Sequence, residues 1–279
     1  MPNPEVTQTV DCFPASAQSR MDEACMLAMD NLIGSDSVMI DFHIRVDPMH
    51  GAQNCFGIGS ALAAAKKLGI KHAGLIVVCD GLDFHFMQDF SKAVRTMSLH
   101  LGITAWSGVE LVRTPPPLLE RSVSLSRTNG AQLVLARGEC IYDDAEHGLN
   151  FAAINAGVDI LSCPGILDKE TAALAAEKDV YVEFSSSPSC GIAAACTIAN
   201  CLDAGCSMVC GSSASNASEL PDDSLWEHLI AGSCFGPQMA KQLRANLLQS
   251  GMRLAQTLMQ SELKLKKPSI MLDEEVDLG

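Results

Sequence analysis

The segment Val38–Gly51, VMIDFHIRVDPMHG, begins as an apolar strand and ends in a loop that carries His43, Arg45 and His50. A histidine at the end of a buried strand is typical of a metal site, because imidazole is a common metal ligand. Two residues later, where a second ligand would be well placed, stands Arg45, whose guanidinium stays protonated and offers no lone pair. The segment therefore predicts a buried strand, and it leaves open whether the polar end binds a metal or something else.

Outward from this segment, short apolar runs alternate with helical patterns. The predicted strands cover residues 37–44, 72–80, 103–111, 131–139, 158–165, 180–185 and 206–212. The predicted helices cover residues 57–70, 86–102, 115–130, 147–157, 167–179, 191–205, 221–232 and 237–263. This alternation favours a parallel sheet covered on both faces, and both an open doubly wound sheet and a barrel fit it. In either fold the chemistry lies at the carboxyl ends of the strands.

The chain divides into three predicted regions. Residues 1–35 form an N-terminal arm with a helix, residues 36–265 form the α/β barrel, and residues 266–279 form a charged, flexible tail. The first residues lack the basic and apolar parts of a secretory signal, and no apolar run is long enough for a membrane span. The sequence therefore indicates a cytoplasmic protein.

Composition narrows the classes of function. Of 279 residues, 48% are apolar and 19% charged, which is ordinary for a globular protein. The net charge of −14 disfavours nucleic-acid binding, because such a surface repels phosphate backbones. The twelve cysteines lack the spacing of a small secreted disulfide scaffold, so we predict reduced thiols.

Polar and thiol side chains follow every predicted strand. In strand order they are His43, Arg45 and His50; Cys79 and Asp80; Glu110; Arg137, Glu139 and Cys140; Cys163; Glu183 and Cys190; and Cys210, Ser212, Ser213 and Ser215. The carboxyl ends of parallel strands meet at one end of the sheet, so these side chains are expected to lie near one another.

With this order of strand-end residues, the chain resembles the PHP (polymerase and histidinol phosphatase) superfamily. The likeness is to its histidinol-phosphatase-like branch, and more distantly to the PHP-fold protein subunit of ribonuclease P. It runs from about residue 38 to 248 and is strongest over SGVEL (107–111), GLNFAAINAGVDILSCPG (148–165), LDKETAALAAEKDVYVEFS (167–185) and ELPDDSL (219–225). The resemblance implies a distorted (β/α)7 barrel. Active members of the family hold two or three metal ions at the strand ends and hydrolyse phosphoesters.

The resemblance also implies that the family's metal site is degenerate here. The family's first motif, Asp-x-His-x-His, corresponds to Asp41, His43 and Arg45. Besides His43, the family's ligands are retained in kind as Asp80 and Glu110. Other ligand positions hold His50, Gly81, Arg137, Cys163, Cys190, Ser213 and Ser215 in this chain. Arginine is not a metal ligand, and serine and glycine are poor ones, so we expect that the multinuclear site does not assemble.

Three interpretations of the strand ends remain open. Arg45 and Arg137, with Ser213 and Ser215, form an anion site, or the two arginines simply pair with nearby carboxylates. A soft metal site for zinc or an iron–sulfur cluster would use Cys140, Cys163 and Cys190 with His43 or His50. A single zinc, manganese or iron ion would use His43, His50, Asp80 and Glu110.

The leading functional prediction is a cofactor-free binding or scaffold subunit of a larger assembly, with protein partners or further copies of itself and a small anionic ligand. The alternative is a metal-dependent hydrolase or lyase with a rebuilt His/Asp/Glu/Cys site, acting on a small phosphorylated or carboxylated metabolite. RNA binding is a third class, suggested by the likeness to the ribonuclease P subunit and disfavoured by the charge of −14.

Overall fold

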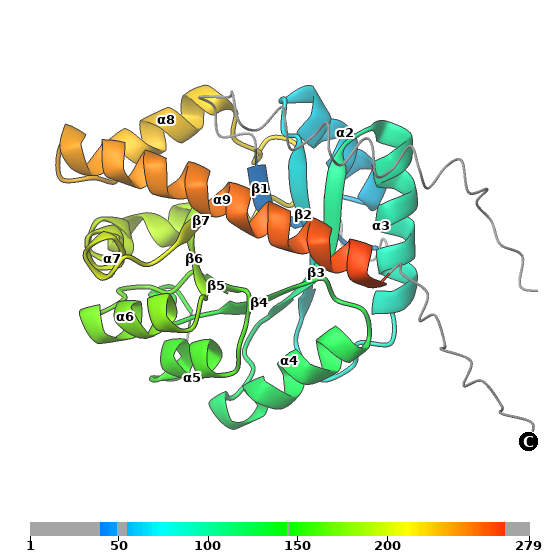
Figure 1. Ribbon diagram of the computed structural model, residues 1–279, viewed down its shortest axis with the longest axis horizontal. Coiled ribbons are helices and arrows are strands. Elements are labelled where there is room, and N and C mark those ends of the chain that lie inside the picture. Colours follow the sequence, from blue (N-terminus) through cyan, green and yellow to red (C-terminus); the bar gives the residue numbers. More distant parts are fainter. Residues whose placement is uncertain (1–39, 49–54, 144, 266–279) are drawn as a thin grey trace, which may run out of the picture. The chain divides into compact units, whose positions relative to one another are not determined.

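A computed structural model describes residues 40–48, 55–143 and 145–265. Seven parallel strands lie side by side in sequence order, with helices around them (Figure 1). The strands are β1 (Ile40–Arg45), β2 (His72–Cys79), β3 (Thr104–Leu111), β4 (Leu133–Arg137), β5 (Ile160–Ser162), β6 (Tyr181–Ser185) and β7 (Met208–Gly211). Each predicted strand contains the observed one or differs from it by a few residues.

The sheet is nearly closed by contacts between β1 and the segment that follows β7. The amide of Arg45 donates to the carbonyl of Ala214 at 2.8 Å, and the amide of Ser213 donates to the carbonyl of His43 at 2.7 Å. Ile44 and Ala214 form a parallel bridge. The structure thus confirms a seven-stranded α/β barrel and decides against the open sheet.

The helices follow the predicted pattern. They are α2 (Ile58–Lys67), α3 (Met87–Leu101), α4 (Leu119–Thr128), α5 (Leu149–Asn155), α6 (Lys169–Glu177), α7 (Gly191–Ala204), α8 (Asp223–Gly232) and α9 (Pro237–Leu265), with short 3₁₀ turns η1 (Pro116–Leu118) and η2 (Pro188–Cys190). The predicted N-cap of α6 is confirmed, because the side chain of Asp168 accepts a hydrogen bond from the amide of Thr171.

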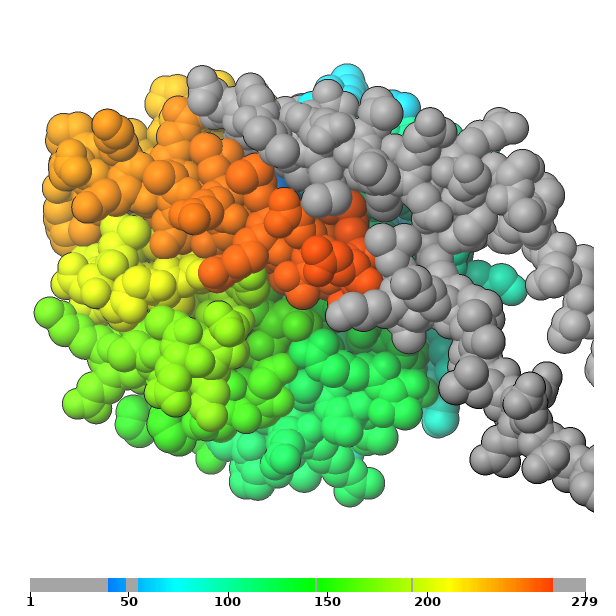
Figure 2. Space-filling view, in the orientation of Figure 1, coloured from blue at the N-terminus to red at the C-terminus, as the bar shows by residue number. Residues whose placement is uncertain are grey.

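The last helix, α9, packs against the amino ends of the strands (Figure 1). Asn246 bonds the amide of Met208 at the start of β7, and Arg253 bonds the hydroxyl of Tyr181 at the start of β6. A Cβ atom at Gly251 would lie 3.4 Å from the side chain of Ile40, the first residue of β1. Figure 2 shows the atoms of α9, orange to red, against the yellow and green segments beside them.

Two glycines let neighbouring strands approach inside the barrel. A Cβ atom at Gly74 on β2 would lie 2.7 Å from the carbonyl carbon of Phe42 on β1. A Cβ atom at Gly108 on β3 would lie 2.8 Å from Cβ of Leu133 on β4. Both distances are too short for real side chains, so a residue without a Cβ is required at each position.

Some predictions fall on residues that the structure does not describe. The N-terminal arm and helix (1–35), the tail (266–279) and His50 lie outside the described residues. Within the described ranges, no helix is both long and apolar enough to cross a membrane.

Candidate functional site

His43 lies at the carboxyl end of the barrel, buried between two carboxylates. Its Nδ1 is 2.6 Å from Oε1 of Glu183, and its Nε2 is 3.3 Å from Oε2 of Glu110. The three side chains come from β1, β6 and β3, so barrel closure is what brings them together. The pairing of β1 with β2 shifts between Asp41 and Ile44, and such irregularities re-aim the side chains beside them.

The two carboxylates decide the charge of His43. Burial by itself lowers the pKa of an imidazole, because it disfavours the charged form. At His43 the negative charges of Glu183 and then Glu110 outweigh burial and raise the pKa to about 9. With this pKa, His43 is a buried cation at neutral pH.

Glu110, fully buried on β3, accepts from several donors. Nη2 of Arg45 donates to its Oε2 at 2.8 Å, and Oγ of Ser162 donates to its Oε1 at 2.8 Å. Nη1 of Arg137 lies 3.8 Å from Oε1. Burial alone raises the pKa of a carboxyl, but His43 and then Arg45 outweigh it and hold the pKa of Glu110 well below its usual range.

Asp41 ties β1 to the end of β7. Its Oδ1 accepts from the backbone amides of His43 and Ser212, each at 3.0 Å. Burial raises its pKa above the usual value, against the opposing effect of the bonds from Ser212. Oγ of Ser213 lies 3.2 Å from Nδ1 of His43, so this serine belongs to the buried histidine cluster.

A pocket of about 660 Å³ lies at the carboxyl ends of β1 to β4. Three arginines line it: Arg45 from β1, Arg137 from β4, and Arg113 from the segment after β3. Apolar side chains complete much of the wall, among them Val112 and Leu149. A cavity of this size, whose wall combines apolar side chains with convergent polar groups, is typical of a small-molecule site.

Each of the outer arginines has an acidic partner close to solvent. Nε of Arg137 forms a short ion pair with Asp143, whose side chain is 42% exposed and also lines the pocket. Nη2 of Arg113 lies 3.1 Å from Oδ2 of Asp80, and both side chains are more than half exposed. Exposed ion pairs contribute about 0–1 kcal/mol to stability, so exchange of these partners for another anion has a small energetic penalty.

Of the four non-glycine residues with positive φ in the described chain, three lie at the same end of the barrel, and the fourth, Asp179, precedes β6. Arg113, Cys163 and Ser213 have positive φ values of 49°, 46° and 55°, although none is glycine. Each follows closely on a strand: β3, β5 and β7 respectively. Non-glycine residues in this region are uncommon and tend to cluster at functional sites.

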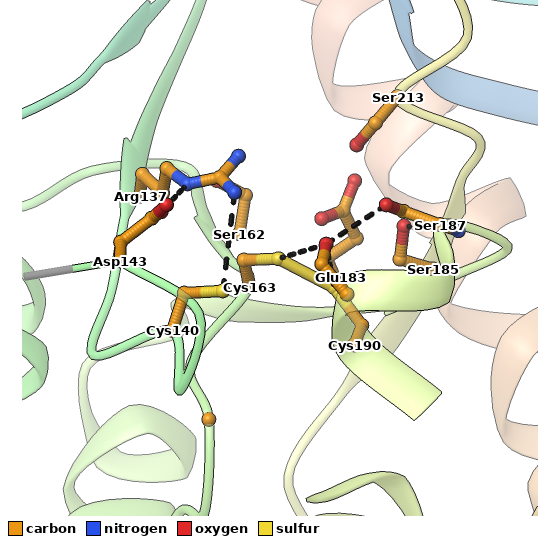
Figure 3. The surroundings of a disulfide bond; sticks show 12 residues. Arg137, Cys140, Asp143, Ser162, Cys163, Glu183, Ser185, Ser187, Cys190 and Ser213 are labelled. Atoms are coloured by element: carbon orange, nitrogen blue, oxygen red, sulfur yellow. Dashed lines mark hydrogen bonds and ion pairs between the residues drawn. A yellow bond between two sulfur atoms is a disulfide. The ribbon is translucent and has the colours of Figure 1, made fainter. Parts of the chain in front are cut away.

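Cys163 and Cys190 are joined by a disulfide (Figure 3). Their Cα atoms are 5.7 Å apart, although 27 residues separate them in sequence. The prediction of reduced thiols is therefore wrong for this pair, because neighbouring strand ends bring them within bonding reach. In this form neither sulfur is a thiolate that binds a metal.

The predicted site residues fall into separate groups. Arg45 and Arg137 share the pocket, whereas Ser213 and Ser215 are not among the described residues that line it. The amide of Ser215 donates to Glu219.

The predicted metal ligands do not converge on one point in the described chain. His43 and Glu110 meet, Asp80 pairs with Arg113, and Cys163 is bonded to Cys190. Among the described residues, no group of three or more His, Cys, Asp or Glu side chains is arranged to hold a metal ion. The guanidinium of Arg45 beside Glu110 also does not fit the ring of metals that the family resemblance implies.

Several residues of the site were not predicted as such from the sequence. The sequence marks Glu183 only as a strand-end residue, and nothing in the sequence marks Ser162. Arg113 lies in a loop two residues after the end of β3. Asp143 lies in a loop six residues after the end of β4. The one available signal was position, because all four lie in or just after the carboxyl end of a strand.

Comparison with known proteins supports the fold. No family model matches the chain. An uncharacterised protein of Methanocaldococcus jannaschii, MJ1295, is 39% identical over 80 residues; the match covers 28% of this chain and 37% of that relative. The chain therefore matches well under two thirds of the relative's length.

Two solved structures show similar folds. A chain in the cryo-EM structure of archaeal ribonuclease P with mature tRNA has a TM-score of 0.57 and 14% identity, and the match covers 86% of this chain and 98% of that one. A. niger ochratoxinase has a TM-score of 0.50 and 12% identity, with coverage of 78% and 71%. Likeness at this level of identity shows that the chain has a TIM-like α/β barrel fold.

Proposed function

We propose that this barrel binds a small anionic ligand, carrying a carboxylate or phosphate group, in the pocket at the carboxyl ends of β1 to β4. The observation that carries the proposal is the convergence of Arg45, Arg113 and Arg137 on one cavity of about 660 Å³. A guanidinium is planar, permanently charged and suited to two-point bonding of carboxylate or phosphate. The chain is then a degenerate member of the PHP-like barrels, and this binding needs no metal.

The charges around the pocket support an anion as the ligand. Two buried carboxylates, Glu110 and Glu183, face three cationic side chains, His43, Arg45 and Arg137. The further negative charge comes from acids nearer to solvent: Asp143 and Glu146 line the pocket, and Asp80 pairs with Arg113. A ligand anion that displaces Asp143 from Arg137 therefore replaces a solvent-facing partner and leaves the buried pairs intact.

The test is a binding titration with inorganic phosphate, pyrophosphate and citrate, measured by calorimetry. We expect Arg137→Gln and Arg45→Gln each to weaken anion binding by about 10- to 100-fold, because a charge-assisted hydrogen bond contributes about 1.5–3 kcal/mol. Asp143→Asn removes the competing carboxylate and is expected to strengthen binding. Dialysis against a chelator should leave the affinity unchanged.

Arg127→Gln is the matched control, because Arg127 is also paired with an acid, Asp159, but does not line the pocket. Wild-type affinity in Arg45→Gln and Arg137→Gln would contradict the proposal, as would equal losses in the Arg127→Gln control. A chain that binds none of the three anions at millimolar concentration would also contradict it.

A second candidate, a role as a subunit of a larger assembly, is favoured by exposed apolar side chains at the same end of the barrel. Leu118, Ile141, Tyr142 and Ile166 follow β3, β4 and β5 and are all more than one third exposed. Apolar groups gathered on a surface mark sites of association. Light scattering on the purified chain tests self-association: a mass above that of one chain, lowered by Ile141→Asp and Ile166→Asp, supports it, and a monomer at high concentration excludes the homo-oligomer.

The position of the pocket also keeps an enzyme among the candidates. Barrel enzymes place their active sites at the carboxyl ends of the strands, where this pocket lies. A hydrolase or lyase acting on the same class of anion is therefore the alternative, and conversion of a bound anion during the titration would distinguish it from a binding protein.

A further inference from the structure

Three cysteines lie just beyond three consecutive strands of the barrel. Cys140 comes three residues after β4, Cys163 directly after β5, and Cys190 in the 3₁₀ turn η2 after β6. The Cα atoms of Cys163 and Cys190 are 5.7 Å apart. Side chains at that separation reach a common point, as their disulfide demonstrates.

The loop that carries Cys140 packs on the loop that carries Cys163. The amide of Gly138 donates to the carbonyl of Ser162 at 2.7 Å. A Cβ atom at Gly138 would lie 2.9 Å from Cα of Pro164, and one at Gly165 would lie 3.1 Å from the carbonyl carbon of Glu139. The two glycines thus permit a backbone approach that a larger residue would prevent. Contact between these loops holds Cys140 beside the Cys163 segment.

The surroundings of the three sulfurs are polar. Figure 3 shows the Cys163–Cys190 pair between Arg137 on one side and Ser187 on the other, with Cys140 on the side of Arg137. Nη2 of Arg137 lies 3.9 Å from Sγ of Cys140, and Oγ of Ser189 lies 3.7 Å from Sγ of Cys163. Arg137 and Ser189 therefore contact two of the three cysteines.

We propose that Cys140, Cys163 and Cys190, once reduced, form a binding site for one thiolate-preferring metal ion, of which zinc is the representative. Thiolates select zinc over the hard cations. Three protein thiolates leave the fourth tetrahedral position for water or an added ligand. The disulfide form excludes the metal, because its two sulfurs are bonded to each other.

The conversion between the two forms balances with a dithiol reductant. The reductant transfers two electrons and two protons to the Cys163–Cys190 bond, giving two thiols, and is itself oxidised to a disulfide. Zinc then binds the three thiols and releases one proton from each. The proposal concerns a site different from the anion pocket, although Arg137 contacts both.

Zinc affinity of the reduced full-length chain is the direct test. The chain is reduced with dithiothreitol, desalted without oxygen, and titrated with zinc against a chromophoric chelator; cobalt serves as the spectroscopic probe for thiolate ligation. We expect one zinc per chain, and loss of binding when the chain is oxidised. Loss of a hydrogen-bond partner of a metal ligand typically weakens metal affinity by roughly 10- to 100-fold. Loss of a ligand itself should weaken it more, so we expect a larger drop in zinc affinity for each of the variants Cys140→Ser, Cys163→Ser and Cys190→Ser.

Cys196→Ser and Cys234→Ser are the matched controls, because both cysteines are free and lie in or after other helices. A measurement on the unmutated chain avoids any failure of the variants to fold: zinc should protect Cys140, Cys163 and Cys190 from alkylation, measured by mass spectrometry, and leave Cys196 unprotected. The proposal is wrong if the reduced chain binds no zinc at micromolar concentration, if Cys140→Ser binds like the wild type, or if the oxidised chain binds equally well.

Discussion

The two ends of the barrel each contain a buried histidine, and the two histidines differ in charge. His43 lies at the carboxyl end on β1, and His72 begins β2 at the amino end. Burial lowers the pKa of both rings, and it brings the pKa of His72 to about 4. Only His43 has carboxylates beside it, Glu183 and Glu110, and they raise its pKa to about 9.

The difference follows from what surrounds each ring. His72 stacks on Trp106 with ring centroids 5.9 Å apart, and neither of its ring nitrogens has a hydrogen-bond partner in the described structure. The ring of Phe42 also stacks against Trp106. His72 thus lies as a neutral ring among aromatic side chains, whereas His43 lies in a cluster of buried charge. Buried charge is costly unless it is paired, so it marks the end of the barrel where binding or chemistry takes place.

The largest expected effect is that of His43→Leu. This change leaves Glu110 and Glu183 buried without their shared cation, and loss of one partner of a buried ion pair costs about 3–5 kcal/mol. The free energy of unfolding, measured by urea denaturation, should fall by that amount. At the amino end, His72→Phe replaces a neutral ring that has no hydrogen bond to any described residue, and it should change the same quantity by less than about 1.5 kcal/mol. Equal losses in the two variants would remove the contrast between the ends.

A smaller effect is expected from Gly211→Ala, at the end of β7. A Cβ atom there would overlap Oε1 of Glu183 and lie 2.9 Å from Cβ of His43, so the carboxylate must move away from the imidazole. Overpacking of this kind costs about 1–3 kcal/mol in free energy of unfolding. Gly191→Ala is the control, because nothing lies within 4 Å of a Cβ at this helical position and the change should be neutral or stabilising. A neutral Gly211→Ala would show that the histidine cluster tolerates displacement.

The smallest expected effect is the change in the free energy of unfolding that His43 causes over one pH unit. Its pKa is about 9 in the folded chain, against 6.5 for an ordinary histidine, so the folded state holds the proton more tightly. The stabilisation is complete below pH 6.5 and is lost as pH rises towards 9, at up to about 1.4 kcal/mol per pH unit. Unfolding curves of the wild type and His43→Leu, compared across this window, should converge towards pH 9. Parallel curves would mean that His43 is neutral in the folded chain.

At acid pH, the contribution of Glu110 to stability changes with pH in the opposite direction. Its folded pKa is held below its usual range, so its contribution is present above the ordinary glutamate value of 4.5 and is lost as pH falls further. Stability measured against pH should therefore be greatest between the ordinary glutamate value and the ordinary histidine value, as far as these two groups decide it.

Much of the fold followed from local patterns. Each strand carries an apolar run and each helix an amphipathic or alanine-rich pattern, so their order could be predicted residue by residue within small margins. The capping role of Asp168 was visible because a side chain and an amide three residues later suffice for it. Closure into a barrel could not be predicted, because the hydrogen bond between Arg45 and Ala214 joins the two opposite edges of the sheet.

The sequence by itself determined the alternating strands and helices, and placed Arg45, Arg137 and Glu110 at strand ends, because hydrophobic periodicity is a local property. Only the tertiary structure decided that Glu183 would charge His43, that Arg113 would join the other two arginines, and that Cys163 would bond Cys190. Those outcomes depend on distances across the barrel, and pairing between distant segments is set by how the whole sheet closes. The same residues in an open sheet would have the same sequence pattern and a different chemistry.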